Sequence, residues 1–165
     1  MKKLLFLLSL LLASGFSHTN QAQTKAQLKI TKRAEKTFVK QADQSLMLIE
    51  QAAQKISIKG VAVVAYIPGE VCSSWISKIK VIGHLTSAKA NLLGIAYTKA
   101  AEMADTHLNS GSGVREIYSG ELGYKGGLIR KVSSGYILTV FSGGSGEQDL
   151  EVAKIGLDKL AEYFK

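Results

Sequence analysis

The sequence predicts a single α+β domain, in which helices cover an antiparallel sheet of about four to five strands. Two runs rich in apolar and β-branched residues, residues 61–66 and 136–141, are typical of buried strands. An apolar residue recurs every three or four positions over residues 34–56, as in a helix that packs on a sheet. The length of 165 residues fits one domain. The predicted order is helix, two strands, helix, loop, two or three strands, helix.

The N-terminus has the pattern of a secretory signal peptide over residues 1–23, which leaves residues 24–165 as the mature domain. Lys2 and Lys3 precede a short apolar core at residues 4–13, and small residues that suit cleavage follow. The apolar core is shorter than the roughly 20 residues of a membrane span. We therefore expect export to the periplasm or the extracellular space, with an uncleaved anchor as the alternative.

The mature chain is basic and has one cysteine. Without Lys2 and Lys3 the net charge of +8 falls to about +6, and much of the excess lies within residues 25–40. Such charge favours anionic ligands, nucleic acid or acidic surfaces. Export argues against nucleic acid, and a solvated helix face is the commoner explanation. Cys72 has no partner for an internal disulfide, and we expect a small buried side chain rather than a reactive thiol.

The first half of the mature chain predicts a long helix and a hairpin. The helical pattern covers residues 25–56, and Gly60 ends it. The basic start of this helix can project and contact another subunit or protein, or it can be a frayed tail. Residues 61–66 form a strand, the Pro-Gly pair at residues 68–69 favours a type II turn, and residues 71–79 return as the second strand.

A central helix and a glycine-rich connection follow. Ser87 is the expected N-cap of a helix over residues 88–108. Residues 109–113 predict a flexible connection, and residues 114–119 a short strand or a turn. The glycines of residues 120–127 predict a loop that either borders a pocket or fits close to the sheet.

The C-terminal third predicts strand, turn, strand and helix. Residues 128–132 alternate apolar and polar, and Gly135 can take a positive φ in the turn before the next strand. Ser145 and Gln148 fit a capping box at the start of the last helix. The helix carries one apolar stripe that can lie on the sheet, formed by Leu150, Ala153, Leu157, Leu160 and Ala161.

This third also resembles a known family. The glycines at residues 126–127, the run S-G-G-x-x-E-Q-D at residues 142–149 and the ending A-x-x-G-L-x-x-L at residues 153–160 resemble the haem-binding-protein-S/glycolate-utilisation-G family. That family also includes the C-terminal domain of a cobalamin adenosyltransferase. The resemblance is strongest over residues 126–160 and weaker over about residues 60–100. It implies a sheet-and-helix domain that tends to form oligomers. The alternative is that these residues simply form a glycine turn followed by a well-capped helix, which explains each of them taken one at a time.

The resemblance also implies two ligand-site candidates. The segment Ala96-Tyr97-Thr98 is similar to the family's A-Y-T segment, near which family members have been proposed to bind haem. Tyr97 and Thr98 are therefore candidates, although Tyr97 can equally be a packed side chain with its hydroxyl at water. The charged pair that commonly precedes this segment in the family is replaced here by Gly94 and Ile95, so no charged site is transferred to this helix.

His84 and His107 are the candidate metal ligands, because a neutral imidazole nitrogen can bind haem iron. They are 23 residues apart, which is about 30 Å along one straight helix. One haem therefore cannot easily take both from one subunit, but it could take one from each of two. Either histidine can instead be a surface or capping residue. Trp75 is a further ligand-site candidate, because its ring can lie against a flat ligand, with a place in the core as the alternative.

The sequence lacks the common catalytic motifs. It contains no G-x-S-x-G, H-E-x-x-H or C-x-x-C, and no Lys-Ser/Thr pair follows the glycines of residues 143–146 as in a P-loop. Together with the resemblance, this predicts an exported, non-enzymatic, homo-oligomeric protein that binds haem or a related tetrapyrrole for storage, transport or sensing. The alternatives are a haem-degrading or corrinoid-related enzyme and a ligand-free sensory partner of a membrane-bound receptor.

Overall fold

Three helices, a four-stranded sheet and a small two-stranded sheet make up the part of the chain that the structure describes. The computed structural model describes residues 2–88 and 90–164, with side-chain environments from residue 25 onward. The main sheet has the order β2-β1-β6-β5, every neighbouring pair is antiparallel, and β3 pairs with β4. The predicted α+β class is confirmed. In chain order the elements are α1 (Lys2–Lys55), β1 (Gly60–Pro68), β2 (Ile76–Ile82), β3 (Thr86–Ser87), β4 (Ala90–Asn91), α2 (Leu92–Thr106), β5 (Gly127–Val132), β6 (Gly135–Ser142) and α3 (Gly146–Ala161).

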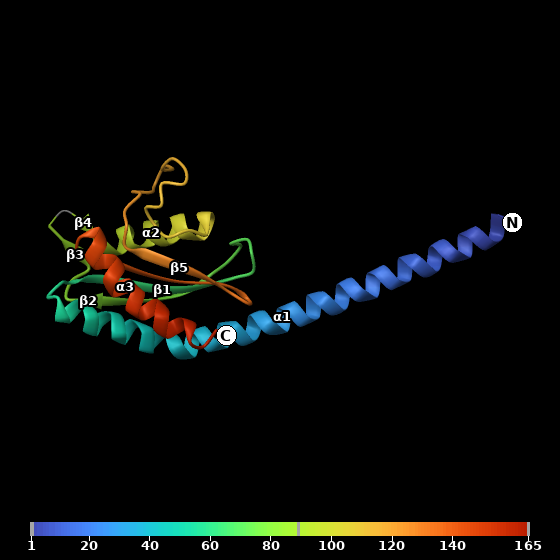
Figure 1. The fold of residues 1–165 in the computed structure, drawn as a ribbon, viewed down its shortest axis with the longest axis horizontal. Coiled ribbons are helices and arrows are strands. Elements are labelled where there is room, and N and C mark those ends of the chain that lie inside the picture. Colours follow the sequence, from blue (N-terminus) through green and yellow to red (C-terminus); the bar gives the residue numbers. More distant parts are fainter. Residues whose placement is uncertain (1, 89, 165) are drawn as a thin grey trace.

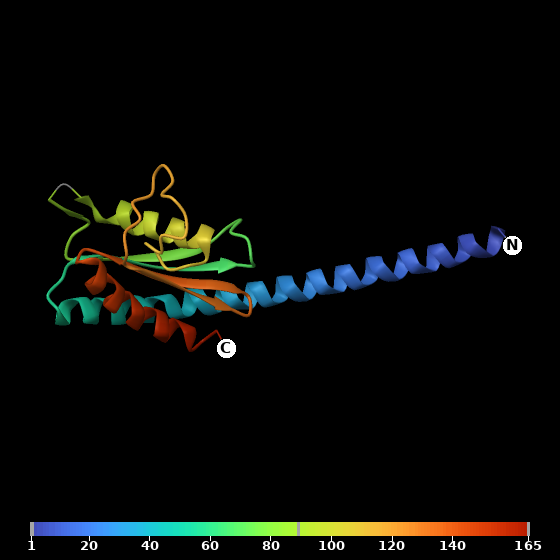
Figure 2. The same ribbon diagram turned by 45° about the horizontal axis from the view of Figure 1, so that its top comes forward.

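The main sheet lies between two helical layers, with α2 on one face and α1 and α3 on the other (Figures 1 and 2). Successive side chains of a strand point to opposite faces. Val61 and Val63 of β1 accordingly pack in the α2 layer, while Ala62 and Val64 pack in the layer of α1 and α3. Because both faces are covered, β6 is buried along its whole length and β1 up to Pro68. This is the physical reason for their nearly continuous apolar runs.

Only the second half of α1 packs against the domain. Ala34, Phe38, Ala42 and Ile49 are buried on one side of the helix, whereas its N-terminal half extends well beyond the sheet (Figures 1 and 2). The helix predicted over residues 25–56 is present and begins earlier, at Lys2. The predicted signal peptide lies outside the residues whose side chains are described. Among the residues that could be searched, no helix has the length and hydropathy needed to cross a bilayer.

Several element boundaries differ from the prediction. The second strand begins at Ile76 rather than at residue 71, because the connection contains a local turn in which the Ser73 N–H donates to the Val71 carbonyl at 2.9 Å. The central helix begins at Leu92. Its N-cap is Asn91, whose side chain accepts from the Gly94 N–H at 3.0 Å.

Ser87, the predicted N-cap, instead pairs with Ala90 in the small sheet. The central helix ends at Thr106 rather than at residue 108. Of the two alternatives for residues 114–119, no strand forms; the segment is an irregular connection that ends in a turn, in which the Glu121 N–H donates to the Tyr118 carbonyl at 3.0 Å.

The C-terminal third follows the prediction closely. The turn between β5 and β6 places Gly135 at φ +143°, and both hydrogen bonds of the predicted capping box between Ser145 and Gln148 are present. In α3, Leu157 and Leu160 are buried as expected, together with Ala153. Leu150 and Ala161 of the predicted stripe are only half-buried.

Candidate functional site

A groove of about 440 Å³ lies where the C-terminal end of α2 meets the connection between β1 and β2. Its volume is in the range of small-molecule sites. One wall comes from the connection and the other from α2 and its cap. The lining residues are Glu70, Val71, Cys72, Trp75, Ala101, Ala104, Asp105 and His107.

His107 caps α2 and contributes an imidazole to this groove. Its backbone takes the left-handed conformation, with φ at +57°, and its N–H donates to the Met103 carbonyl at 2.9 Å. The ring stacks on Tyr136 of β6, with 4.1 Å between ring centroids and 8° between planes. Among the described residues, Nε2 is buried without a hydrogen-bond partner. A buried polar atom without a partner destabilises a fold, so this nitrogen calls for a functional explanation.

Trp75 and Tyr97 form an aromatic pair beside the groove. Their ring centroids are 6.4 Å apart and their planes 21° apart. The Tyr97 hydroxyl lies 3.1 Å from the Ser77 Oγ, and Trp75 packs half-buried against the α2 layer. Tyr97 therefore supports Trp75 rather than lining the groove itself. Thr98 is directed elsewhere, because its hydroxyl donates to the Ile95 carbonyl within α2 at 2.9 Å.

A polar network connects the groove to the β5–β6 hairpin. Glu70 Oε2 accepts from Lys131 Nζ at 3.0 Å and from the Tyr136 hydroxyl at 3.2 Å. The bond from Lys131 is the main reason that the pKa of Glu70 is lowered, and the same bond raises the pKa of Lys131. Lys131 and Tyr136 pair across the β5–β6 hairpin, but Glu70 lies far from both in the sequence, so no local pattern predicts the network.

A second network ties the glycine-rich connection, residues 107–126, to the other side of the groove. The Arg115 guanidinium donates to Asp105 Oδ2 at 2.9 and 3.1 Å and to both Glu121 carboxylate oxygens at 2.8 Å. It also lies 3.8 Å from the centroid of the Tyr118 ring. The hydrogen bonds from Arg115 are the main reason that the pKa of Glu121 falls to about 2. Arg115 therefore fixes this long connection beside Asp105.

Cys72 is exposed, which corrects the prediction of a buried side chain. The reason is that its segment is a connection outside the sheet, so no layer covers it. Partial desolvation raises the pKa of the thiol, which keeps it mainly protonated at neutral pH. The groove thus contains an accessible thiol beside Trp75 and His107.

His84 lies away from the groove, towards the opposite end of α2. The Leu92 N–H, at the start of α2, donates to the carbonyl of the neighbouring Leu85 at 3.1 Å. Since α2 has 15 residues, about 22 Å of helix separates the two histidines. The structure therefore brings together Trp75 and His107, with Tyr97 behind them, and leaves out His84 and Thr98. No group of three or more His, Cys, Asp or Glu side chains suited to a metal ion occurs in the part of the chain that was searched.

A buried ion pair borders a second hollow, of about 500 Å³, next to the glycine-rich turn after β6. Lys99 Nζ of α2 donates to Asp149 Oδ2 at 2.8 Å and to the Phe141 carbonyl at 2.9 Å. Asp149 Oδ1 accepts from the Gly144 N–H at 2.8 Å. Burial lowers the pKa of Lys99 and raises that of Asp149, while their mutual attraction opposes both shifts. The pair joins α2, β6 and α3, and because Lys99 and Asp149 are 50 residues apart, no local pattern predicts it.

This pair and its neighbours explain most of the S-G-G-x-x-E-Q-D run. Ser145 and Gln148 form the capping box, and Asp149 holds Lys99. Gly143 lies so close to the Lys59 carbonyl oxygen that a Cβ atom would collide with backbone. The run therefore specifies how α3 starts and how it is attached to the sheet.

Comparison with known proteins supports the fold. No family model matches the chain, and no curated protein matches its sequence. Similar solved structures include a PduOC:heme complex, with a TM-score of 0.53 and 15% identity over 72% of this chain and 90% of that chain. They also include the Klebsiella pneumoniae protein ORFY, of family model DUF336, with a TM-score of 0.48 and 18% identity over 73% of this chain and 87% of that one. The Ybr137w protein matches with a TM-score of 0.49 and 18% identity, over 82% and 88% of the two chains. At such identities the likeness to PduOC shows a shared fold, in agreement with the fold that the sequence resemblance implies.

Proposed function

We propose that this chain binds haem, or a closely related tetrapyrrole, in the groove beside His107. The observation that carries the proposal is the His107 imidazole, which lines the groove and whose Nε2 is buried without a partner among the described residues. Imidazole nitrogen is the commonest protein ligand of haem iron. The haem complex of PduOC, which has the same fold, adds support.

The other walls of the groove suit a flat, largely apolar ligand with acidic groups. Trp75, Ala101 and Ala104 supply apolar surface. Two cations lie nearby, but each already pairs with a carboxylate that lines the groove: Lys131 with Glu70 and Arg115 with Asp105. Either cation could bind a haem propionate only by weakening its present ion pair. We therefore expect moderate rather than very tight affinity. When bound, haem would supply its iron chemistry, while the protein holds the macrocycle and one axial position.

The proposal is tested by titrating the protein with haemin and following two signals. The Soret band reports iron ligation, and fluorescence reports occupancy of the groove, because Trp75 is the single tryptophan of the chain. We expect saturation near one haem per chain, with quenching of Trp75. His107→Ala should abolish the ligated Soret band, and His84→Ala should keep it, since His84 lies towards the other end of α2.

Each other outcome contradicts a defined part of the proposal. An unsaturable or flat titration removes haem binding. A ligated band that survives in His107→Ala but is lost in Cys72→Ser would assign the axial position to the thiol, which lines the same groove. Loss in His84→Ala alone would move the site to the opposite end of α2.

We further propose that the protein is exported and acts without catalysis, as a store, carrier or sensor of its ligand. The support for export is the basic and apolar pattern of residues 1–23. N-terminal sequencing of the protein recovered from its own cells, with separate soluble and membrane fractions, tests this. An intact N-terminus in the cytoplasmic fraction would contradict it.

Self-association is proposed on a separate observation. Five large apolar side chains are exposed within residues 114–124 of the connection between α2 and β5, and a group of exposed apolar side chains is typical of protein–protein interaction sites. Sedimentation equilibrium of wild type and Ile117→Asp tests this surface, and a wild-type monomer would contradict the proposal. The five residues are Val114, Ile117, Tyr118, Leu122 and Tyr124.

A further inference from the structure

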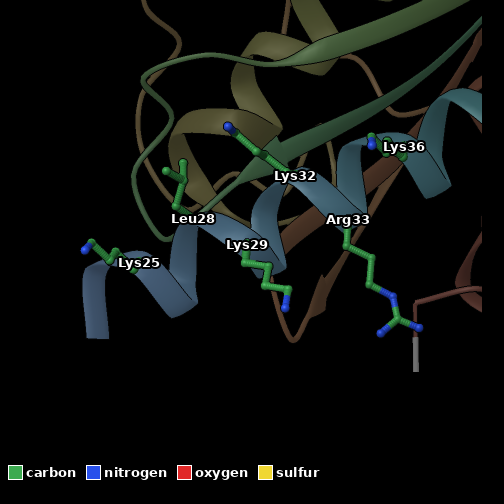
Figure 3. Close-up of a pocket in the computed structure, with 6 residues that line it drawn as sticks. All are labelled: Lys25, Leu28, Lys29, Lys32, Arg33 and Lys36. Atoms are coloured by element: carbon green, nitrogen blue, oxygen red, sulfur yellow. The ribbon is translucent and has the colours of Figure 1, made fainter. Parts of the chain in front are cut away.

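The middle of α1, where the helix leaves the domain, carries a one-sided row of cations, here called the lysine stripe. Spacings of three and four residues place its lysines within an arc of about 80°, taking about 100° per residue. Figure 3 looks onto this side of the helix, with Leu28 and Lys32 on one side and Lys29 and Arg33 on the other. The stripe consists of Lys25, Lys29, Lys32, Lys36 and Lys40.

The stripe faces solvent and its charges are not used inside the domain. All five lysines are exposed, and Ala34 and Phe38, which pack on the sheet, lie on the other side of the helix. None of the ion pairs among the described residues involves a stripe lysine. The next acid along the same side, Asp43, pairs with Lys78 and ends the row.

The length of the row of lysines favours an extended binding partner. From Lys25 to Lys40 the row is about 22 Å long, at 1.5 Å per residue. A small anion could engage only one or two of these lysines at once. A second copy of the same stripe would be repelled. A partner that engages the whole row must therefore present many anionic groups over a similar length, as the surface of an anionic bilayer does.

Two further features favour a lipid surface over nucleic acid. Leu28 projects at the edge of the stripe with 54% of its surface exposed, and an apolar side chain beside lysines is favourable in the interfacial layer of a bilayer. The predicted export would also separate the chain from nucleic acid.

We propose that the lysine stripe binds the surface of membranes that contain anionic lipids. Each lysine near such a surface contributes roughly a five-fold gain in binding, and the gain is screened by salt. The stripe would hold the domain beside the membrane, with the groove on the body of the domain still accessible. This inference does not depend on haem binding.

The test is co-sedimentation of the full chain with phosphatidylcholine vesicles that contain or lack phosphatidylglycerol, at low and at physiological ionic strength. The stripe variant carries Lys25→Glu, Lys29→Glu, Lys32→Glu and Lys36→Glu. A matched control makes the same charge change at four exposed lysines elsewhere, namely Lys55, Lys59, Lys125 and Lys154. Circular dichroism checks that both variants keep their helix content.

We expect binding only to vesicles with phosphatidylglycerol, a loss of at least about 100-fold in the stripe variant, and a much smaller loss in the control variant. Replacing the same four stripe lysines by arginine should keep the binding. An equal loss in the control variant would assign the effect to net charge and overturn the proposal. Equal binding to phosphatidylcholine alone would assign it to the apolar N-terminal residues. Binding to a DNA duplex without binding to the anionic vesicles would assign the stripe to nucleic acid.

Discussion

The buried pair of Lys99 and Asp149 makes a quantitative prediction about stability. Only 2% and 4% of the two side chains are exposed. Lys99→Met removes the amine at similar volume and leaves the carboxylate without its cation, whereas Asp149→Asn leaves the ammonium group without its anion. Removing one partner of such a pair costs about 3–5 kcal/mol. At about 4 °C per kcal/mol for a domain of this size, each single variant should lower the Tm by roughly 12–20 °C.

The double variant separates coupling from packing. With both charges removed, neither is left uncompensated, so the cost should fall short of the sum of the single costs by about 2–3 kcal/mol. The assay is urea unfolding followed by circular dichroism, with thermal unfolding alongside. Lys154→Met is the control, because the pair of Lys154 with Asp158 is exposed and such pairs contribute less than about 1 kcal/mol.

Two results would refute this reasoning. Single variants that each cost less than about 1 kcal/mol would mean that water reaches the pair, contrary to its burial. Strictly additive costs would mean that each side chain acts through packing alone, and that the ion pair does not couple α2 to the start of α3.

Three further predictions concern the turn after β6, the long connection and the groove. Gly143→Ala should cost at least about 2 kcal/mol in urea unfolding, because its Cβ would collide with the Lys59 backbone; Gly94→Ala meets nothing closer than 3.4 Å and should be neutral or stabilising. The pKa of Glu121 is about 2 against an ordinary 4.5, so its contribution is complete above about pH 4.5 and is lost as the pH falls through 2. Protection factors for amide hydrogen exchange in the connection, measured against the intrinsic rate at each pH, should fall across that window, and Arg115→Ala should move the titration of Glu121 towards 4.5; a midpoint that does not move contradicts the pairing. The alkylation rate of Cys72 should keep rising with pH beyond the range in which an ordinary thiol levels off, since its pKa is raised, and haem should protect it; equal rates with and without haem would place the ligand outside the groove.

The elements that sequence reasoning located correctly are those with a strong local signal. β1 and β6 are covered on both faces, which requires unbroken apolar runs, and the capping box of α3 is a pattern within four residues. The start of α2 was misplaced because Ser87 and Asn91 are both good N-cap residues. Local propensity does not show that Ser87 pairs with Ala90 in a small two-stranded sheet and so cannot cap the helix.

Of the residues that line the groove, sequence reasoning proposes only Trp75 and His107 as ligand-site candidates. Trp75 and His107 stand out by residue type, and the structure places both in one groove. The polar partners are set by tertiary contacts between distant segments, as between Glu70 and Lys131 or between Lys99 and Asp149. The sequence predicts a strand before β2 because Val71 and Cys72 are residues common in strands. The polar residues around them, however, have no alternating pattern.

His107 occupies the helix end at which glycine is the most common residue. The left-handed backbone conformation of His107 destabilises the fold by about 1–2 kcal/mol. Stacking of its ring on Tyr136 stabilises the fold by about 0.5–1.5 kcal/mol. His107→Gly should therefore be neutral or stabilising for folding, since it also removes the buried Nε2 that has no partner among the described residues. Stability then gives natural selection little reason to prefer histidine at this position over glycine. If His107 binds haem as proposed, a stability scan that includes this position should find it tolerant, while a haem-binding scan should find it intolerant.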